Sequence, residues 1–295
     1  MSRPSSAALA ATLAVGFGLL GAVAPVSADA APSACPEHFY AGQEPDLYNP
    51  KLAVGARDLC FIAFGVEHSA QTRTPLWSAE HLTRDNLEAA RGLPREGVFH
   101  AEPGLPADEA ADLGDYRRSG YDRGHMSPNG DMPTLEAQQQ SFSLANMVPQ
   151  APVLNRQLWE RIESGVRHWA VRADELYVVT GPVFQGQNLQ ALNGRVLVPT
   201  LIYKAIYDPG GNRAGVYLVR NADDSDYTVL SIDQLTRLTG IDVFPALPSD
   251  VKAHATDLPA PLRRGSRGGN RGRGHDQTAA PWSEPFGGHT RETTR

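Results

Sequence analysis

The chain has 295 residues, a hydrophobic fraction of 41% and a formal net charge of −6. This length suits one sizeable domain with its own core, and the lack of an internal repeat excludes a repeat architecture. The acidic balance argues against binding to nucleic acid through overall positive charge.

The N-terminal segment has the pattern of a secretory signal peptide. Arg3 precedes an uncharged apolar run over residues 7–23, and small residues with cleavage options after Ala28 or Ala30 follow. We therefore predict a signal peptide over residues 1–30, a secreted or periplasmic location, and no membrane contact after cleavage. An uncleaved membrane anchor is the alternative.

The two cysteines, Cys35 and Cys60, lie near the start of the remaining chain. An exported protein meets an oxidising compartment, so the pair predicts one disulfide bond, with two free buried thiols as the alternative. Closing a loop of about 25 residues would stabilise the fold by roughly 3 kcal/mol in the chain-entropy model.

The elements between the cysteines and the C-terminal tail favour a mixed α+β domain with a mostly antiparallel sheet. Thr134 is placed to cap a short helix over 135–140, and Asn155 to begin a strong helix that ends at 173. Ser231 and Gln234 predict a capping box for a last helix closed by Gly240. The predicted strands or extended segments are 59–64, 77–82, 142–148, 176–180, 196–207, 216–219 and 228–230, and residues 91–120 read as a long surface loop.

One short stretch, YDRGHMSPNGDM at residues 121–132, concentrates chemistry and turn residues. The imidazole of His125 can accept a proton at neutral pH, and the guanidinium fork of Arg123 suits a phosphate. Asp122 could orient the ring or hold a structural contact. The combination favours phosphoryl chemistry, since the sequence lacks a G-x-S-x-G elbow and an H-E-x-x-H helix. The alternative is a structural histidine beside an Asp–Arg ion pair.

A second group of polar residues lies on the helix that begins at Asn155. Asn155, Trp159 and Glu163 fall within about 80° on a helical wheel. An amide oxygen and a carboxylate at this spacing could face one Mg²⁺ ion and its waters. The alternatives are an ordinary helix cap for Asn155 and a solvated surface charge for Glu163.

These motifs together resemble those of the DNA/RNA non-specific endonuclease family, the group that includes mitochondrial endonuclease G. Residues 122–125 are similar to the family's DRGH signature, and residues 146–155, NMVPQAPVLN, to its second motif. The resemblance continues at residues 72–77, 177–182 and 241–248 and covers most of 40–255.

The resemblance implies a ββα-metal fold and one bound Mg²⁺, with Mn²⁺ as a possible substitute. Asn155 would be the direct protein ligand of the ion. Glu163 would hold some of the ion's waters.

The resemblance also implies catalytic roles. His125 would be the general base, and Arg123 would stabilise charge on the phosphate. Asn146 would support the site, and Arg95 is the candidate for a further arginine from the long loop.

The implied substrates are DNA and RNA together, because contacts to phosphates carry no sequence information. A local basic groove from Arg117, Arg118, Arg123, Arg156 and Arg161 would offset the acidic body. The oligomeric state is left open, with a homodimer as one option. Two rival functions are a secreted nucleic-acid-binding module without turnover, which would be indifferent to magnesium, and a metal phosphodiesterase that acts on small esters.

The C-terminal segment, 258–295, is rich in Gly, Arg and Pro and is predicted to be a disordered tail. Residues 263–295 hold seven arginines against three acids. The tail either contacts anionic partners or is a solvated segment without a role. The predicted endonuclease domain is therefore residues 31–257.

Overall fold

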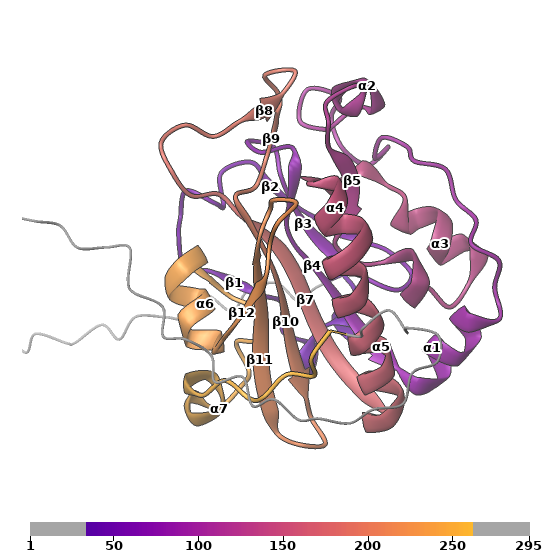
Figure 1. The fold of residues 1–295 in the computed structure, drawn as a ribbon, viewed down its shortest axis with the longest axis vertical. Coiled ribbons are helices and arrows are strands. Elements are labelled where there is room, and N and C mark those ends of the chain that lie inside the picture. Colours follow the sequence, from indigo (N-terminus) through magenta and orange to yellow (C-terminus); the bar gives the residue numbers. More distant parts are fainter. Residues whose placement is uncertain (1–33, 262–295) are drawn as a thin grey trace, which may run out of the picture.

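The computed structural model describes residues 34–261 (Figure 1). The predicted signal peptide and nearly all of the predicted tail lie outside the described residues. Within them, no helix is both long enough and apolar enough to cross a membrane.

A seven-stranded antiparallel sheet forms the centre of the fold, in the order β12-β11-β10-β7-β4-β3-β2. This confirms the predicted α+β class with a mostly antiparallel sheet. The strands are β1 (Asp46–Leu47), β2 (Ala56–Cys60), β3 (Gly65–Ser69), β4 (Thr74–Thr83), β5 (Asp122–His125), β6 (Met147–Gln150), β7 (Glu175–Val183), β8 (Ala191–Leu192), β9 (Val196–Leu197), β10 (Leu201–Asp208), β11 (Arg213–Arg220), β12 (Tyr227–Leu230) and β13 (Ile241–Asp242).

Helices cover both faces of the sheet (Figure 1). The α-helices are α1 (Arg84–Arg91), α2 (Leu113–Tyr116), α3 (Leu135–Ser141), α4 (Pro152–Leu154), α5 (Glu160–Ala173), α6 (Ile232–Thr239) and α7 (Ser249–Ala253). The remaining helical turns are η1 (Pro36–His38), η2 (Tyr40–Gly42), η3 (Asn129–Asp131), η4 (Leu144–Asn146) and the π-helical turn η5 (Asn155–Trp159).

The alternation of side chains along the central strands explains the two helical layers. Val178 of β7 packs in one hydrophobic cluster with Ile162 and Trp169 of α5. The next residue, Val179, packs in the opposite cluster with Leu235 of α6. Because both faces are covered, the central strands are apolar on both sides and read as continuous hydrophobic runs in the sequence.

Several predicted elements are confirmed with their local signals. Residues 77–82 lie inside β4, and Thr134 accepts a hydrogen bond from the Ala137 amide at the start of α3. Ser231 and Gln234 form the capping box of α6, and Gly240 ends this helix with a left-handed φ of 75°.

Other predicted elements are wrong in their boundaries. The strand predicted over 59–64 ends at Cys60, and the following residues form the turn between β2 and β3. The long loop contains the short helix α2, and the segment over 142–148 includes the turn η4. The predicted strand over 196–207 is divided into β9 and β10.

The helix predicted to begin at Asn155 begins one turn earlier, at Pro152. Proline suits the first helical position because its missing N–H has no intrahelical partner there. Asn155 therefore lies inside the helix, at the π-helical turn η5, and its backbone amide donates to the Ala151 carbonyl at 2.9 Å. Local π geometry of this kind occurs frequently at functional sites.

The strands β5 and β6 and the following helix form a ββα unit on the α5 side of the sheet (Figure 1). The two strands are antiparallel, with Gly124 opposite Val148 and His125 opposite Met147. A Cβ atom at Gly124 would lie 2.6 Å from the Gln150 Cβ, so only glycine allows this close approach. The unit places the DRGH residues across from the first turns of the helix.

Candidate active site

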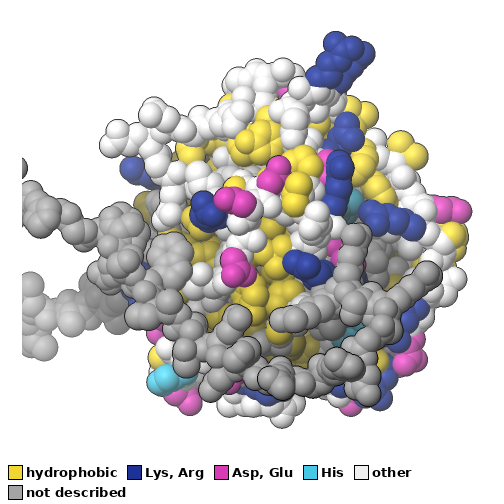
Figure 2. All heavy atoms as spheres, in the orientation of Figure 1, with side chains coloured by type: hydrophobic (Ala, Val, Ile, Leu, Met, Phe, Trp, Pro, Cys, Tyr) yellow, Lys and Arg dark blue, Asp and Glu magenta, His cyan; other side chains and the backbone are white. Residues whose placement is uncertain are grey.

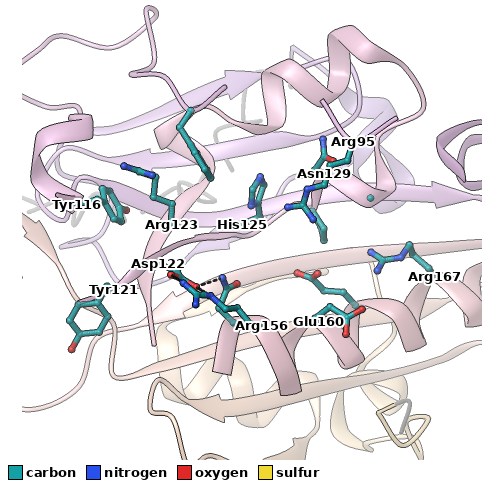
Figure 3. A pocket seen from close by; sticks show the side chains of 15 residues that line it. Arg95, Tyr116, Tyr121, Asp122, Arg123, His125, Asn129, Arg156, Glu160 and Arg167 are labelled. Carbon is teal, nitrogen blue, oxygen red and sulfur yellow. Dashed lines mark hydrogen bonds and ion pairs between the residues drawn. The ribbon is translucent and has the colours of Figure 1, made fainter. Parts of the chain in front are cut away.

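A cavity of about 550 Å³ lies between β5 and the helix formed by η5 and α5 (Figure 3). It brings together six of the seven residues predicted to form the site, which are Arg95, Asp122, Arg123, His125, Asn155 and Glu163. The other lining residues are Phe99, Tyr116, Tyr121, Pro128, Asn129, Gly130, Arg156, Glu160 and Arg167.

His125 presents a neutral imidazole to this cavity. Its ring packs edge-on against Phe142, with 5.0 Å between the ring centroids. Burial lowers the pKa of His125 to about 3, and the positive charge of Arg95 contributes to the same shift. The Nε2 atom is buried and has no hydrogen-bond partner within the described chain. The ring is thus held in place by packing, with Nε2 closed off from solvent.

Arg123 lies two residues before His125 on β5, so both side chains project to the same side of the strand. The guanidinium carbon lies 4.8 Å from the centroid of the Phe99 ring and 5.6 Å from that of Tyr116. Its Nε is buried and lacks a hydrogen-bond partner among residues 34–261. Aromatic contacts therefore orient the cation without neutralising it.

Asp122 does not contact His125, so the interpretation that it orients the ring is wrong. Its carboxylate accepts hydrogen bonds from Asn155 Nδ2 at 3.0 Å and from Arg156 Nε at 2.8 Å. Because a carboxylate can only accept, this contact fixes the amide nitrogen of Asn155 toward Asp122 and its carbonyl oxygen away from it. Asp122 is thus a structural residue that orients Asn155.

Asn155 and Glu163 supply the oxygen atoms that suit a hard divalent cation. Neither the Asn155 carbonyl oxygen nor the Glu163 carboxylate has a hydrogen-bond partner in the part of the chain that the structure describes. Burial raises the pKa of Glu163 to about 7, although the positive charges of Lys204 and Arg167 oppose the shift. The two residues line one cavity and are free to hold an ion and its waters.

Asn146 is buried and does not line the cavity. Its carbonyl oxygen accepts from the Ser127 amide at 2.9 Å, and its Nδ2 donates to the carbonyls of Ser127 and Ser141. The side chain fastens the segment that follows His125 to the end of α3. The role of Asn146 in supporting the site, which the resemblance implies, stays a prediction.

The sequence did not predict eight of the residues that line the cavity, among them Arg167 and Asn129. Arg167 donates to Asp131 at 2.8 Å, and Asn129 is buried with its Nδ2 unpartnered within the described residues. The spacing of four between Glu163 and Arg167 was a signal for the first, since it places both on one helix face. Asn129 had no comparable signal, because it lies in the turn η3.

A buried pair of ionisable side chains, Glu80 and Lys204, lies on the sheet near the segment that follows His125. The Nζ of Lys204 on β10 is 3.9 Å from Oε1 of Glu80 on β4, and both side chains are 1% exposed. The ammonium also donates to Thr180 Oγ1 at 2.6 Å and to the carbonyl of Met126, next to His125, at 3.5 Å. Burial, together with the negative charge of Asp131, raises the pKa of Glu80 well above its usual value.

The predicted basic groove is only partly assembled in the cavity. Arg123 and Arg156 line it, but Arg161 does not, and Arg156 is paired with Asp122. Arg117 and Arg118 are exposed on the segment that joins α2 to β5. On the face drawn in Figure 2, basic side chains gather over the region where Figure 1 places α2, β5 and α4.

The Cys35–Cys60 disulfide is present, as predicted. Among the described residues, the one cluster of His, Cys, Asp and Glu side chains with metal-ligand spacing is formed by these two cysteines and His38. Their sulfur atoms are consumed by the disulfide, so this cluster does not compete with the cavity as a metal site.

Comparison with known proteins identifies the family. The model of the DNA/RNA non-specific endonuclease family matches residues 43–250. Nuclease C1 of Cunninghamella echinulata var. echinulata is 34% identical over 61% of this chain and 75% of its own length. The mitochondrial nuclease EXOG of Danio rerio is 32% identical over 65% of this chain and 62% of its own length.

A solved structure of the EndoG/EndoGI complex, described in terms of EndoG inhibition, has the same fold. It superposes with a TM-score of 0.58 at 25% sequence identity, covering 62% of this chain and 84% of that chain. The ββα-metal fold expected from the resemblance is therefore confirmed.

The predicted secreted or periplasmic location is contradicted by these relatives. Several of the matched nucleases, including the one from Danio rerio, are named as mitochondrial proteins. The location was inferred from residues 1–30, and an apolar run followed by small residues does not by itself specify export.

The family match covers nearly all of the folded residues and includes both strands and the helix that enclose the cavity. The chain belongs to the DNA/RNA non-specific endonuclease family and is a metal-dependent enzyme that hydrolyses nucleic acids.

Proposed function

We propose that this chain cleaves phosphodiester bonds within both DNA and RNA, with His125 as the general base and one Mg²⁺ ion held by Asn155. The observation that carries the proposal is a neutral, half-buried histidine ring that lines the same cavity as Arg123 and the Asn155–Glu163 pair. The catalytic domain is taken as residues 31–257, with 258–295 as an appended basic tail.

The first step that the chain performs is removal of a proton from the attacking water. A general base must be unprotonated at the working pH and within hydrogen-bond reach of the water. His125 is unprotonated because burial and Arg95 disfavour its cation. A ring nitrogen of His125 takes the proton, and the contact with Phe142 keeps the ring from turning away as charge develops.

Arg123 would bind the phosphate that is attacked. Its guanidinium offers a planar fork to two phosphate oxygens, and no carboxylate within residues 34–261 forms an ion pair with it. Its charge therefore acts on the substrate. Arg95 lines the same cavity and would add to the positive field around the phosphate.

Asn155 would bind the ion through its side-chain carbonyl oxygen, and Glu163 would accept hydrogen bonds from the ion's waters. When bound, the ion stabilises negative charge on the phosphate and leaving-group oxygens. Asp122 contributes by orienting the Asn155 amide. Mn²⁺ would serve the same oxygen donors.

The test is digestion of plasmid DNA and total RNA by the purified chain, with Mg²⁺ and with EDTA. The variant is His125→Ala, and the matched control is His254→Ala, which removes an exposed histidine outside the cavity. We expect metal-dependent cleavage of both substrates by the wild type and the control. The rate of the His125→Ala variant should fall by about 10²- to 10⁴-fold, the usual contribution of general base catalysis.

Two outcomes would favour the rival functions. Binding of nucleic acid without cleavage under any divalent metal would support a binding module. Turnover of bis(p-nitrophenyl) phosphate without cleavage of plasmid or RNA would support an esterase for small substrates. The metal assignment has a separate readout, because Asn155→Ala should weaken Mg²⁺ binding measured by calorimetry without nucleic acid present.

A further inference from the structure

The cavity extends beyond the groups that act on the phosphate. Tyr121 lies immediately before Asp122 and lines the same cavity. Figure 3 shows Tyr121 at one end, Arg95 and Arg167 at the other, and His125 between them. The mechanism assigns no role to the end that Tyr121 occupies, although a polynucleotide must extend past the scissile phosphate in both directions.

The Tyr121 ring is held in this position by packing and by hydrogen bonds. It is half-buried and packs against the apolar cluster that contains Leu192 and Val196. Its hydroxyl donates to Gln190 Oε1 at 2.8 Å, and its backbone amide donates to Ser119 Oγ at 3.1 Å. An aromatic ring supported from behind and fixed at its hydroxyl is preorganised to receive a flat ligand at little entropic cost.

The charges around Tyr121 suit a polyanion with flat substituents. Arg117 and Arg118 are exposed on the segment leading to Tyr121, and neither forms an ion pair within residues 34–261. In contrast, Arg156 is paired with Asp122 through two hydrogen bonds. Unpaired cations on the segment that leads to an exposed aromatic edge resemble the combination of positive charge and aromatic rings with which single-strand-binding proteins hold phosphates and stack bases.

We propose that Tyr121 forms a nucleobase subsite, on which the base adjacent to the scissile phosphate stacks while Arg117 and Arg118 contact the flanking phosphates. A base inside a duplex is already stacked between its neighbours and cannot occupy this subsite without being unstacked. The enzyme should therefore prefer single-stranded nucleic acid. This inference rests on the proposed nuclease function and specifies its substrate.

The test compares binding of two labelled eight-residue oligomers by fluorescence anisotropy in EDTA, where no cleavage occurs. One is oligothymidylate, and the other carries abasic tetrahydrofuran residues, so that it has the same phosphates without bases. Stacking of one base on an aromatic ring is worth about 1–3 kcal/mol, or about 5- to 150-fold in affinity. We expect the wild type to prefer oligothymidylate by a factor in this range.

Two variants separate stacking from folding. Tyr121→Leu keeps the apolar contact but removes the ring, and should bind both oligomers about equally. Tyr121→Phe keeps the ring and should retain the wild-type preference. An unchanged preference in Tyr121→Leu, or the absence of a preference in the wild type, would overturn the subsite.

Cleavage assays give an independent check and distinguish this inference from the proposed function. With Mg²⁺, the wild type should cut a single strand faster than the same sequence in a duplex, and Tyr121→Leu should narrow that difference mainly through KM. If the wild type cuts both forms and the variant changes neither rate, the subsite is wrong and the nuclease stands. If the wild type cuts nothing but still prefers oligothymidylate, the nuclease function fails and the subsite stands.

Discussion

At His125, two effects decide the protonation state on which the proposed chemistry depends. The ring is desolvated by its surroundings, and Arg95 adds a positive charge that disfavours the imidazolium. Both effects act in the same direction, so the pKa lies at about 3 instead of near 6.5. The ring is therefore neutral across the physiological range and carries no second ring proton before the attacking water binds.

The first prediction concerns Arg95. The Arg95→Gln substitution removes one of the two causes of the lowered His125 pKa. The pKa should therefore rise toward 6.5, while burial of the ring keeps it below that value. Titration of the His125 ring nitrogens by NMR, with and without the substitution, measures the shift. If the His125 pKa is the same in both proteins, Arg95 does not act on the ring.

The same shift has a consequence for stability. Between pH 3 and 6.5 the unfolded chain binds a proton at His125 that the folded chain does not. His125 therefore does not lower the free energy of unfolding above pH 6.5. As the pH drops from 6.5 toward about 3, the proton bound by the unfolded chain lowers the free energy of unfolding progressively. Because Arg95→Gln raises the pKa of His125 in the folded chain, it should shorten the pH range over which stability is lost, at the acidic end of that range.

At the level of elements, the ββα unit depends on the close approach of β5 and β6. Gly124 is the position where this approach is tightest, because an added Cβ would meet both the Cβ and the Oε1 of Gln150. The glycine of the DRGH sequence is thus required by packing. The chemistry of its neighbours depends on this packing, since Arg123 and His125 flank it on the same strand.

We predict that Gly124→Ala lowers the free energy of unfolding by about 1–3 kcal/mol, the usual cost of overpacking. Gly165→Ala is the matched control, because a Cβ at this helical position would meet nothing within 4 Å. The control should be stabilised by about 0.5–1 kcal/mol through helix propensity. Urea denaturation of both variants measures the difference, and equal midpoints would contradict the packing argument.

The sheet strands β4 and β10 support the site through the Glu80–Lys204 pair. The Lys204→Met substitution removes the cation next to the buried carboxyl group of Glu80. We expect it to lower the free energy of unfolding by about 3–5 kcal/mol. The double variant Glu80→Leu/Lys204→Met should recover part of that loss, because replacing both partners avoids an unpaired buried charge. Thermal or chemical unfolding of the three proteins tests this, and additive losses would show that the two residues are not coupled.

At the scale of the whole molecule, the disulfide links the N-terminal segment of the described chain to β2, the strand at one edge of the sheet. It closes a loop with a sequence separation of 25 residues. Reduction, or the Cys35→Ser/Cys60→Ser variant, should cost roughly 3 kcal/mol in the chain-entropy model and lower Tm. Neither cysteine lines the cavity, so nuclease activity at 25 °C should persist while the fold remains populated. Loss of activity without a change in Tm would contradict this.

The features that the sequence predicted best depend on near neighbours in the chain. The Thr134 cap and the Ser231–Gln234 capping box each involve residues within three positions of one another. The DRGH residues are also contiguous, so their resemblance to a family signature needed no tertiary information. The contact between Asp122 and Asn155 spans 33 positions and could not be predicted in this way.

The sequence by itself determined the fold class, the family and most of the predicted site residues that line the cavity, because strand alternation, helix caps and short motifs are set by local stereochemistry. Only the tertiary structure decided that Asp122 orients Asn155 instead of His125, that the helix begins at Pro152, and that Arg167 and Tyr121 face the same cavity. These facts depend on the register of β5 with β6 and on the packing of the helix across them. Such contacts join residues far apart in the chain, and their energies arise only when burial brings the side chains together.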